Sequence, residues 1–223
     1  MGKSSAFDLL GPIMVGPSSS HTAGAVRLGK MARTILGGMP ERAQVILHGS
    51  FAQTGKGHGT HEALVAGLLG FNPDDERIPE ALAVAQGLGL KVEFQAADLG
   101  DVHPNTVKFI LTDEQGENVE VVGSSIGGGR IRIEQVNGFP VEITGDYPVL
   151  IVLHQDLPGV VAQVTSLLAT AQVNIAQMRV AREKKGARAL MVVETDQRVA
   201  PAAVELMHKV PAVLHALVIE PLH

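Results

Sequence analysis

Apolar and polar residues along the first 90 positions predict short buried strands and helices that end at glycine. Residues 22–36 read as a helix, and Gly37-Gly38 follows it as a stop signal. The apolar run Val45-Ile46-Leu47 predicts a buried strand. Residues 61–69, stopped by Gly70, and residues 79–88 predict two further helices.

From Lys91 the pattern changes to the period of two that is typical of strands. Strands are expected at residues 91–94, 106–111, 119–122 and 130–133, with a short last strand after Gly138. The segment Asp113-Glu114-Gln115-Gly116 separates two of them as a plausible hairpin turn.

The pattern starts again near Gly145. Strands are expected at 147–154, 173–181, 187–194 and 213–219, and helices at 158–171 and 200–209. This order, β-α-β-β-α-β, is that of a ferredoxin-like unit. We therefore expect an α+β protein with two domains, residues 1–145 and 146–223.

Composition and charge narrow the possible functions. The chain has 223 residues, of which 45% are hydrophobic and 18% charged, as in a globular protein. A net charge of -5 and only 3% aromatic residues argue against nucleic-acid binding. No apolar run approaches the ~18 residues of a membrane span, and residues 1–12 lack a signal-peptide core. We expect a cytoplasmic protein with no membrane and no nucleic-acid partner.

The chain contains no cysteine. It therefore cannot form disulfides, use a cysteine nucleophile, or hold zinc or an iron–sulfur cluster through thiolates.

Two polar segments stand out before predicted helices. Residues 16–22, Gly-Pro-Ser-Ser-Ser-His-Thr, place three hydroxyls beside free backbone N–H groups, which suits a carboxylate or phosphate. The same residues could instead form an N-cap with a loop histidine. In residues 54–61, Thr-Gly-Lys-Gly-His-Gly-Thr-His, glycines flank His58, so an imidazole suited to proton transfer could approach a ligand closely. The alternative is a glycine loop without a chemical role.

Three further segments are less specific. Residues 103–106, His-Pro-Asn-Thr, read as an ordinary turn, and the glycine-rich residues 123–130 suit either an anion cradle or a bulged hairpin. In the second half, Asp156-Leu157-Pro158-Gly159 suits helix initiation, although Gly159 also allows a small ligand to approach, and Asn174 opens the next strand.

These segments together resemble the beta chain of bacterial iron–sulfur-dependent L-serine dehydratase over essentially the whole length. The resemblance is carried by residues 7–12, 16–24, 56–60, 102–106 and 126–129 in this order, of which 16–24 and 56–60 are specific. Residues 1–145 are also similar to the allosteric substrate-binding domain of some D-3-phosphoglycerate dehydrogenases. Residues 146–223 resemble an ACT domain, a regulatory module that often binds amino acids.

The resemblance implies β-elimination of L-serine to pyruvate and ammonia. It implies a [4Fe–4S] cluster as Lewis acid, and since this chain has no cysteine, the cluster would belong to a partner alpha subunit, with no metal in this chain. His58 and His21 become the candidates for the base or substrate-orienting group, without a ranking between them. The expected substrate-binding residues are Ser18, Ser19, Ser20, Thr22, Lys56, Gly57, Gly59 and Thr60.

The resemblance also carries expectations about regulation and assembly. Asp156, Gly159 and Asn174 would contact the regulatory ligand of the ACT domain, and ACT domains commonly pair, so we expect a homodimer. His61 stands where the family usually has an acidic residue, which removes a carboxylate from that position.

Two alternatives remain open from the sequence. A non-catalytic amino-acid sensor with an ACT domain explains the missing cysteines equally well, but not a histidine in a glycine loop. A fragment related to phosphoglycerate dehydrogenase lacks the Gly-x-Gly-x-x-Gly signature of dinucleotide binding.

Overall fold

Two compact units make up the chain, residues 1–137 and 138–223. The structure, a computed structural model, describes residues 14–16, 18–54 and 59–222. It contains both sheets and helices, as the α+β prediction required. The two units divide after Asn137, but the next strand, Phe139–Ile143, is hydrogen-bonded into the first sheet. The domain boundary that we expected at residue 145 therefore stays a prediction.

The first sheet has six strands in the order β2-β1-β3-β4-β5-β6. Its strands are β1 (Arg42–Leu47), β2 (Lys91–Ala96), β3 (Thr106–Thr112), β4 (Asn118–Gly127), β5 (Arg130–Val136) and β6 (Phe139–Ile143). Neighbouring strands β1 and β2 run parallel, whereas β1–β3, β3–β4 and β4–β5 are antiparallel. The helical elements are η2 (Ser19–Ala23), α1 (Gly24–Leu36), α2 (Gly49–Thr54), α3 (Thr60–Leu69), η3 (Ile78–Glu80) and α4 (Ala81–Gly87).

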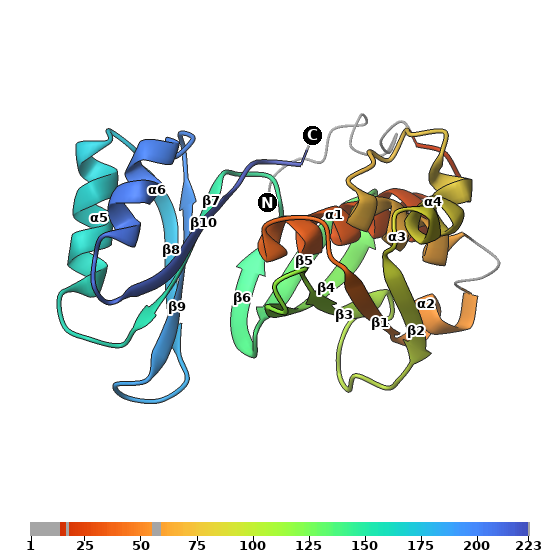
Figure 1. Cartoon of the computed structure of the whole chain (residues 1–223), viewed down its shortest axis with the longest axis horizontal. Helices are drawn as coiled ribbons and strands as arrows, with labels where there is room; N and C mark the ends of the chain where they lie inside the picture. Colours follow the sequence, from red (N-terminus) through yellow and green to blue (C-terminus); the bar gives the residue numbers. More distant parts are fainter. Residues whose placement is uncertain (1–13, 17, 55–58, 223) are drawn as a thin grey trace, which may run out of the picture. The chain divides into compact units, whose positions relative to one another are not determined.

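One face of this sheet forms the core because apolar side chains alternate along its strands. Val45, Phe109 and Val121 are paired across three strands and fully buried. Helix α1 lies over the sheet (Figure 1), where Gly123 provides the space that the Leu28 side chain occupies. Helix α3 packs against α1, and the crossing is close because glycines on both helices face each other.

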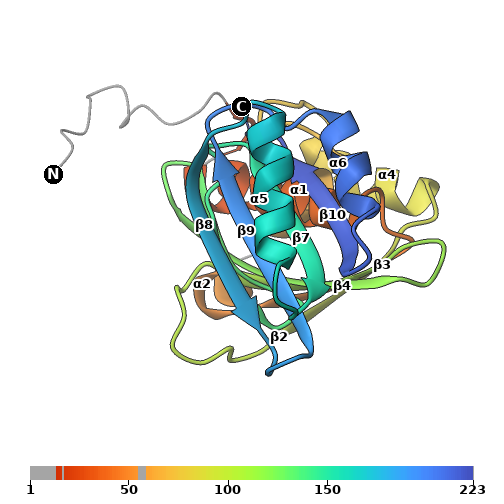
Figure 2. The same ribbon diagram turned by 90° about the vertical axis from the view of Figure 1, so that its left-hand side faces the viewer.

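The second unit is a ferredoxin-like fold, as predicted. Its sheet has the order β10-β7-β9-β8, and α5 and α6 lie side by side over one face of it (Figure 2). The elements are β7 (Val149–Gln155), α5 (Val160–Thr170), β8 (Ile175–Arg182), β9 (Arg188–Thr195), α6 (Pro201–His208) and β10 (Val213–Ile219). Leu150, Val152, Leu168, Met191 and Met207 belong to the core between sheet and helices. Strand β8 is an edge strand, with Met178 and Val180 40% and 42% exposed.

Candidate functional site

The imidazole of His21 joins two segments that are far apart in the sequence. Its Nδ1 atom lies 3.2 Å from Ser20 Oγ and 3.4 Å from Ser18 Oγ. Its Nε2 atom lies 3.1 Å from Thr54 Oγ1 and 3.2 Å from Ser50 Oγ, both on α2. The ring also meets Phe51 edge to face at 5.3 Å between centroids. The serine motif (residues 16–22) is thus attached to α2, whose last residue, Thr54, begins the glycine motif (residues 54–61).

The serine motif forms a cap and a π-helical turn. Ser18 has extended backbone angles, and its Oγ accepts the backbone N–H of His21 at 3.3 Å. The buried Thr22 packs against Gly16, whose φ of +134° and lack of a Cβ atom allow the close approach. A π-turn in front of an α-helix is rare and often lies at a functional site. Capping therefore accounts for Ser18, but not for the position of His21.

The segment 103–106 does more than make a turn. The Pro104 carbonyl accepts the N–H of Ser50 at 2.8 Å, and Gly49 (φ +52°) lies so close that a Cβ atom would be 2.6 Å from this carbonyl oxygen. The Asn105 carbonyl accepts the N–H of Ser125 at 3.0 Å. This segment therefore holds the start of α2 and the glycine-rich strand end together.

The glycine-rich segment 123–130 is a bulged hairpin, one of its two expected conformations. The β4–β5 register shifts between Ser125 and Gly127, and Gly127 and Gly128 have positive φ. Arg27 Nη1 on α1 donates to the Gly129 carbonyl at 2.9 Å. Ser125 Oγ lies so close to Gly24 that a methyl group there would collide with it. The hairpin is thus attached to the first turns of α1, beside the serine motif.

The glycine motif is described only in part. Lys56, Gly57 and His58 lie outside the described residues. Gly59, with φ +68°, is the N-cap of α3, and Thr60 is fully buried in its first turn. The His61 ring stacks on Phe94 of β2 with 4.1 Å between centroids, so this imidazole packs on an aromatic ring.

Three buried hydroxyls in this region have no hydrogen-bond partner within the described parts of the chain. They belong to Thr22, Thr60 and Ser125. A buried hydroxyl without a hydrogen-bond partner is costly, so these three groups distinguish the region from the rest of the core. Ser19, the remaining predicted substrate-binding residue, begins the π-helical turn beside them.

Several residues near the motifs were not singled out by the sequence. Ser50 and Arg27 carry no motif pattern, and Thr54, the first residue of the glycine motif, was not among the expected site residues. His48, which precedes α2, accepts the Leu99 N–H on its Nδ1 at 3.1 Å and donates its own backbone N–H to Thr106 at 3.0 Å. His48 is therefore part of the support of α2.

The site does not fit an iron–sulfur cluster. The chain has no cysteine, and no group of three or more histidine, aspartate or glutamate residues that could hold a metal ion exists in residues 14–16, 18–54 and 59–222. What the site offers is hydroxyl and imidazole groups, which suit a carboxylate and proton transfer.

In the second unit the three predicted ligand residues lie at two ends of the sheet. Asp156 follows β7 and accepts the Gly186 N–H at 3.0 Å and Arg182 Nη1 at 3.1 Å. The hydrogen bond from Gly186 and the Arg182 guanidinium hold the pKa of Asp156 below its usual value. Gly159, with φ +90°, is the N-cap of α5.

Asn174 donates its side-chain N–H to Asp196 at 2.6 Å, at the opposite end of β9. Eight residues along an extended strand separate the two ends by about 25 Å. Next to Asp156, the buried His154 uses Nδ1 on the Gln155 carbonyl at 2.7 Å, while its Nε2 has no partner in the described parts of the chain. The sequence did not single out this imidazole, because a histidine at the end of an apolar strand carries no pattern.

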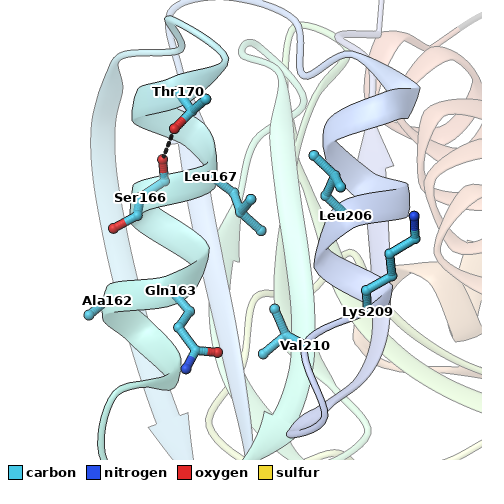
Figure 3. Close-up of a pocket in the computed structure, with 8 residues that line it drawn as sticks. All are labelled: Ala162, Gln163, Ser166, Leu167, Thr170, Leu206, Lys209 and Val210. Atoms are coloured by element: carbon cyan, nitrogen blue, oxygen red, sulfur yellow. Dashed lines mark hydrogen bonds between the residues drawn. The ribbon is translucent and has the colours of Figure 1, made fainter.

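A groove of about 440 Å³ lies between α5 and α6 (Figure 3). Leu167, Leu206 and Val210 line it, together with the polar side chains of Gln163 on α5 and Lys209 after α6. The groove contains none of the predicted ligand residues, so it adds nothing to the site at Asp156.

Comparison with known proteins identifies both units. Residues 5–136 match the serine dehydratase beta chain family and residues 148–212 the ACT domain family. The chain is 46% identical to a probable L-serine dehydratase beta chain of Bacillus subtilis, over 94% of this chain and 95% of that protein. It is 43% identical to the L-serine dehydratase beta chain of Peptoniphilus asaccharolyticus, over 86% and 87%. A D-3-phosphoglycerate dehydrogenase of Synechocystis is 28% identical over 88% of this chain and 35% of that protein.

None of the helices in the described segments is long and apolar enough to cross a membrane.

Proposed function

The chain belongs to the serine dehydratase beta-chain family, and we propose that it forms, with a cysteine-bearing alpha chain, an enzyme that converts L-serine to pyruvate and ammonia. The observation that supports this most is the arrangement around His21, where the serine motif and α2 meet. The alternative of a detached amino-acid sensor is not favoured, because relatives that match most of the chain are dehydratase beta chains.

The residues of this chain have two tasks in the proposed reaction. Hydroxyls of Ser18, Ser19, Ser20 and Thr22 bind the substrate carboxylate, close to the start of α1. An imidazole near this site takes the α-proton of serine while the hydroxyl group leaves as water, which gives aminoacrylate. Aminoacrylate then takes up water and releases ammonia, so that pyruvate remains.

The alpha chain holds the [4Fe–4S] cluster in this proposal, since this chain offers no thiolate. The cluster supplies Lewis acidity toward the leaving hydroxyl when it is bound. The chain by itself is inactive, because the groups that bind serine and the metal that activates it belong to different subunits.

Two further parts of the proposal concern the second unit. The exposed edge strand β8, with Met178 and Val180, supports pairing of two copies into a homodimer. The region of Asp156 and Gly159 supports a small amino acid as regulatory ligand, because Nε2 of the buried His154 beside it has no partner among the described residues. Asn174, about 25 Å away in the same chain, would take part only from a second copy.

Anaerobic reconstitution tests the two-subunit function. We expect neither pyruvate from L-serine nor iron–sulfur absorbance from the purified chain, and pyruvate formation after the native alpha chain with its cluster is added. Pyruvate from this chain alone would contradict the proposal, as would an inactive mixture whose cluster content is complete. Sedimentation velocity of the same chain at micromolar concentration should show a dimer, and a strict monomer would argue against pairing through β8.

A further inference from the structure

Hydroxyl groups surround the His21 ring on both sides. Ser18 and Ser20 lie at Nδ1, and Ser50 and Thr54 lie at Nε2, with all four O···N distances between 3.1 and 3.4 Å. The Phe51 ring closes a further side. The imidazole therefore connects the cap of the serine motif with two successive turns of α2.

The hydrogen bonds of Thr54 decide which ring nitrogen carries the proton. Thr54 Oγ1 donates its single hydrogen to the Ser50 carbonyl at 2.8 Å. Toward His21 it can therefore only accept, which requires an N–H on Nε2. In the neutral ring the single lone pair then lies on Nδ1, where one of the two serine hydroxyls, Ser20 at 3.2 Å or Ser18 at 3.4 Å, donates to it, and the other keeps its hydrogen for the substrate carboxylate.

We propose that His21 is a positioning residue, protonated at Nε2, which fixes α2 against the serine motif and does not itself remove the substrate proton. This inference rests on the proposed dehydratase function and separates the two histidines that the sequence left unranked. A general base must have its lone pair within hydrogen-bond reach of the proton that it removes. The lone pair of His21 points instead at Ser18 and Ser20, which are expected to bind the substrate carboxylate.

The position of α2 makes this contact important for the reaction. The helix has six residues, begins at Gly49 against Pro104, and ends at Thr54, the first residue of the glycine motif. Because the helix is so short, we expect that losing the hydrogen bonds from His21 to Ser50 and Thr54 shifts its last turn. A displacement of about 1 Å near reacting groups costs about 10²-fold in rate.

Kinetics of the assembled, cluster-replete enzyme test the inference with variants at both ends of the contact. His21→Ala should lower kcat by about 10²-fold. His21→Gln, whose amide can still donate to Thr54, should recover about tenfold of this loss and keep the wild-type pH profile. Thr54→Val, which has nearly the same shape but cannot accept a hydrogen bond, should lower kcat on its own, yet add little when combined with His21→Gln.

Matched controls separate positioning from proton transfer. His58→Ala should lower kcat by about 10²–10⁴-fold and remove one ionisation from the pH profile. His208→Ala, an exposed histidine of the second unit, should leave the kinetics unchanged. Nitrogen-15 NMR of the imidazole in the chain alone should show His21 protonated at Nε2. This measurement does not depend on enzyme activity.

The outcomes discriminate clearly. If His21→Gln is as inactive as His58→Ala and loses an ionisation, His21 is the base and the inference is wrong. An Nδ1-protonated ring, or Thr54→Val with wild-type kinetics, would also overturn it. If instead the wild-type assembly produces no pyruvate, the proposed function fails, and the NMR result still decides the ring state of His21.

Discussion

A single methyl group between α1 and α3 is expected to destabilise the first unit. Gly29 and Gly67 face each other where these helices cross. A Cβ atom at Gly67 would lie 2.6 Å from Lys30 N and 2.8 Å from Gly29 Cα, and it would collide with the Val26 carbonyl. All three neighbours are backbone atoms, so no side-chain rotation relieves the contact, and Gly67→Ala must push the helices apart.

The magnitude follows from two opposing terms. Alanine in a helix interior is about 1 kcal/mol more favourable than glycine. Overpacking a close interface costs about 1–3 kcal/mol, and rigid backbone neighbours place this contact at the upper end. The net loss is therefore about 2 kcal/mol in the free energy of unfolding. In a chain of this size it lowers Tm by about 4–8 °C.

Urea denaturation followed by circular dichroism measures this loss, and Gly87→Ala is the matched control. Gly87 ends α4, and a methyl group added to it would meet no atom within 4 Å among the described residues. Its substitution should therefore leave stability unchanged or raise it by up to about 1 kcal/mol. Gly29→Ala combined with Gly67→Ala should cost less than the sum of the single changes, because the helices are already separated. A Gly67→Ala protein as stable as the wild type would refute the close-crossing argument.

Two predictions concern the second unit. Asp156→Asn removes the charged acceptor of Gly186 and Arg182, which holds the Asp156 pKa below 3.8. The stability difference between this variant and the wild type should therefore be complete above pH 3.8 and should shrink as pH falls through the lower pKa of the folded state. The urea midpoint of both proteins, measured against pH, tests this. A difference that grows on acidification would contradict it. L-serine at millimolar concentration should raise the Tm of the wild-type chain more than that of His154→Gln, since Nε2 of the buried ring has no partner among the described residues. An equal shift in both would exclude His154 from binding.

Local patterns in the sequence determine most of the elements. Each strand and helix of the second unit lies within a few residues of its predicted range, because alternation and helical spacing are properties of neighbouring residues. The order β-α-β-β-α-β then leaves few ways to pair the strands, and the sheet has the order expected for it. The motifs that carry the family resemblance are also readable from the sequence, since they are continuous segments.

Tertiary structure decides what those motifs contact. Helix α2 was not predicted, because six residues with one buried aromatic side chain, Phe51, show no helical period. His21 meets Ser50 and Thr54 across 29 and 33 positions, so no local pattern encodes their contact. The turn at Pro104 appeared ordinary for the same reason, although its carbonyl holds the start of α2. The sequence names the residues of the site, whereas the packing of α2 against the serine motif determines the tautomer of His21 and the partners of its ring.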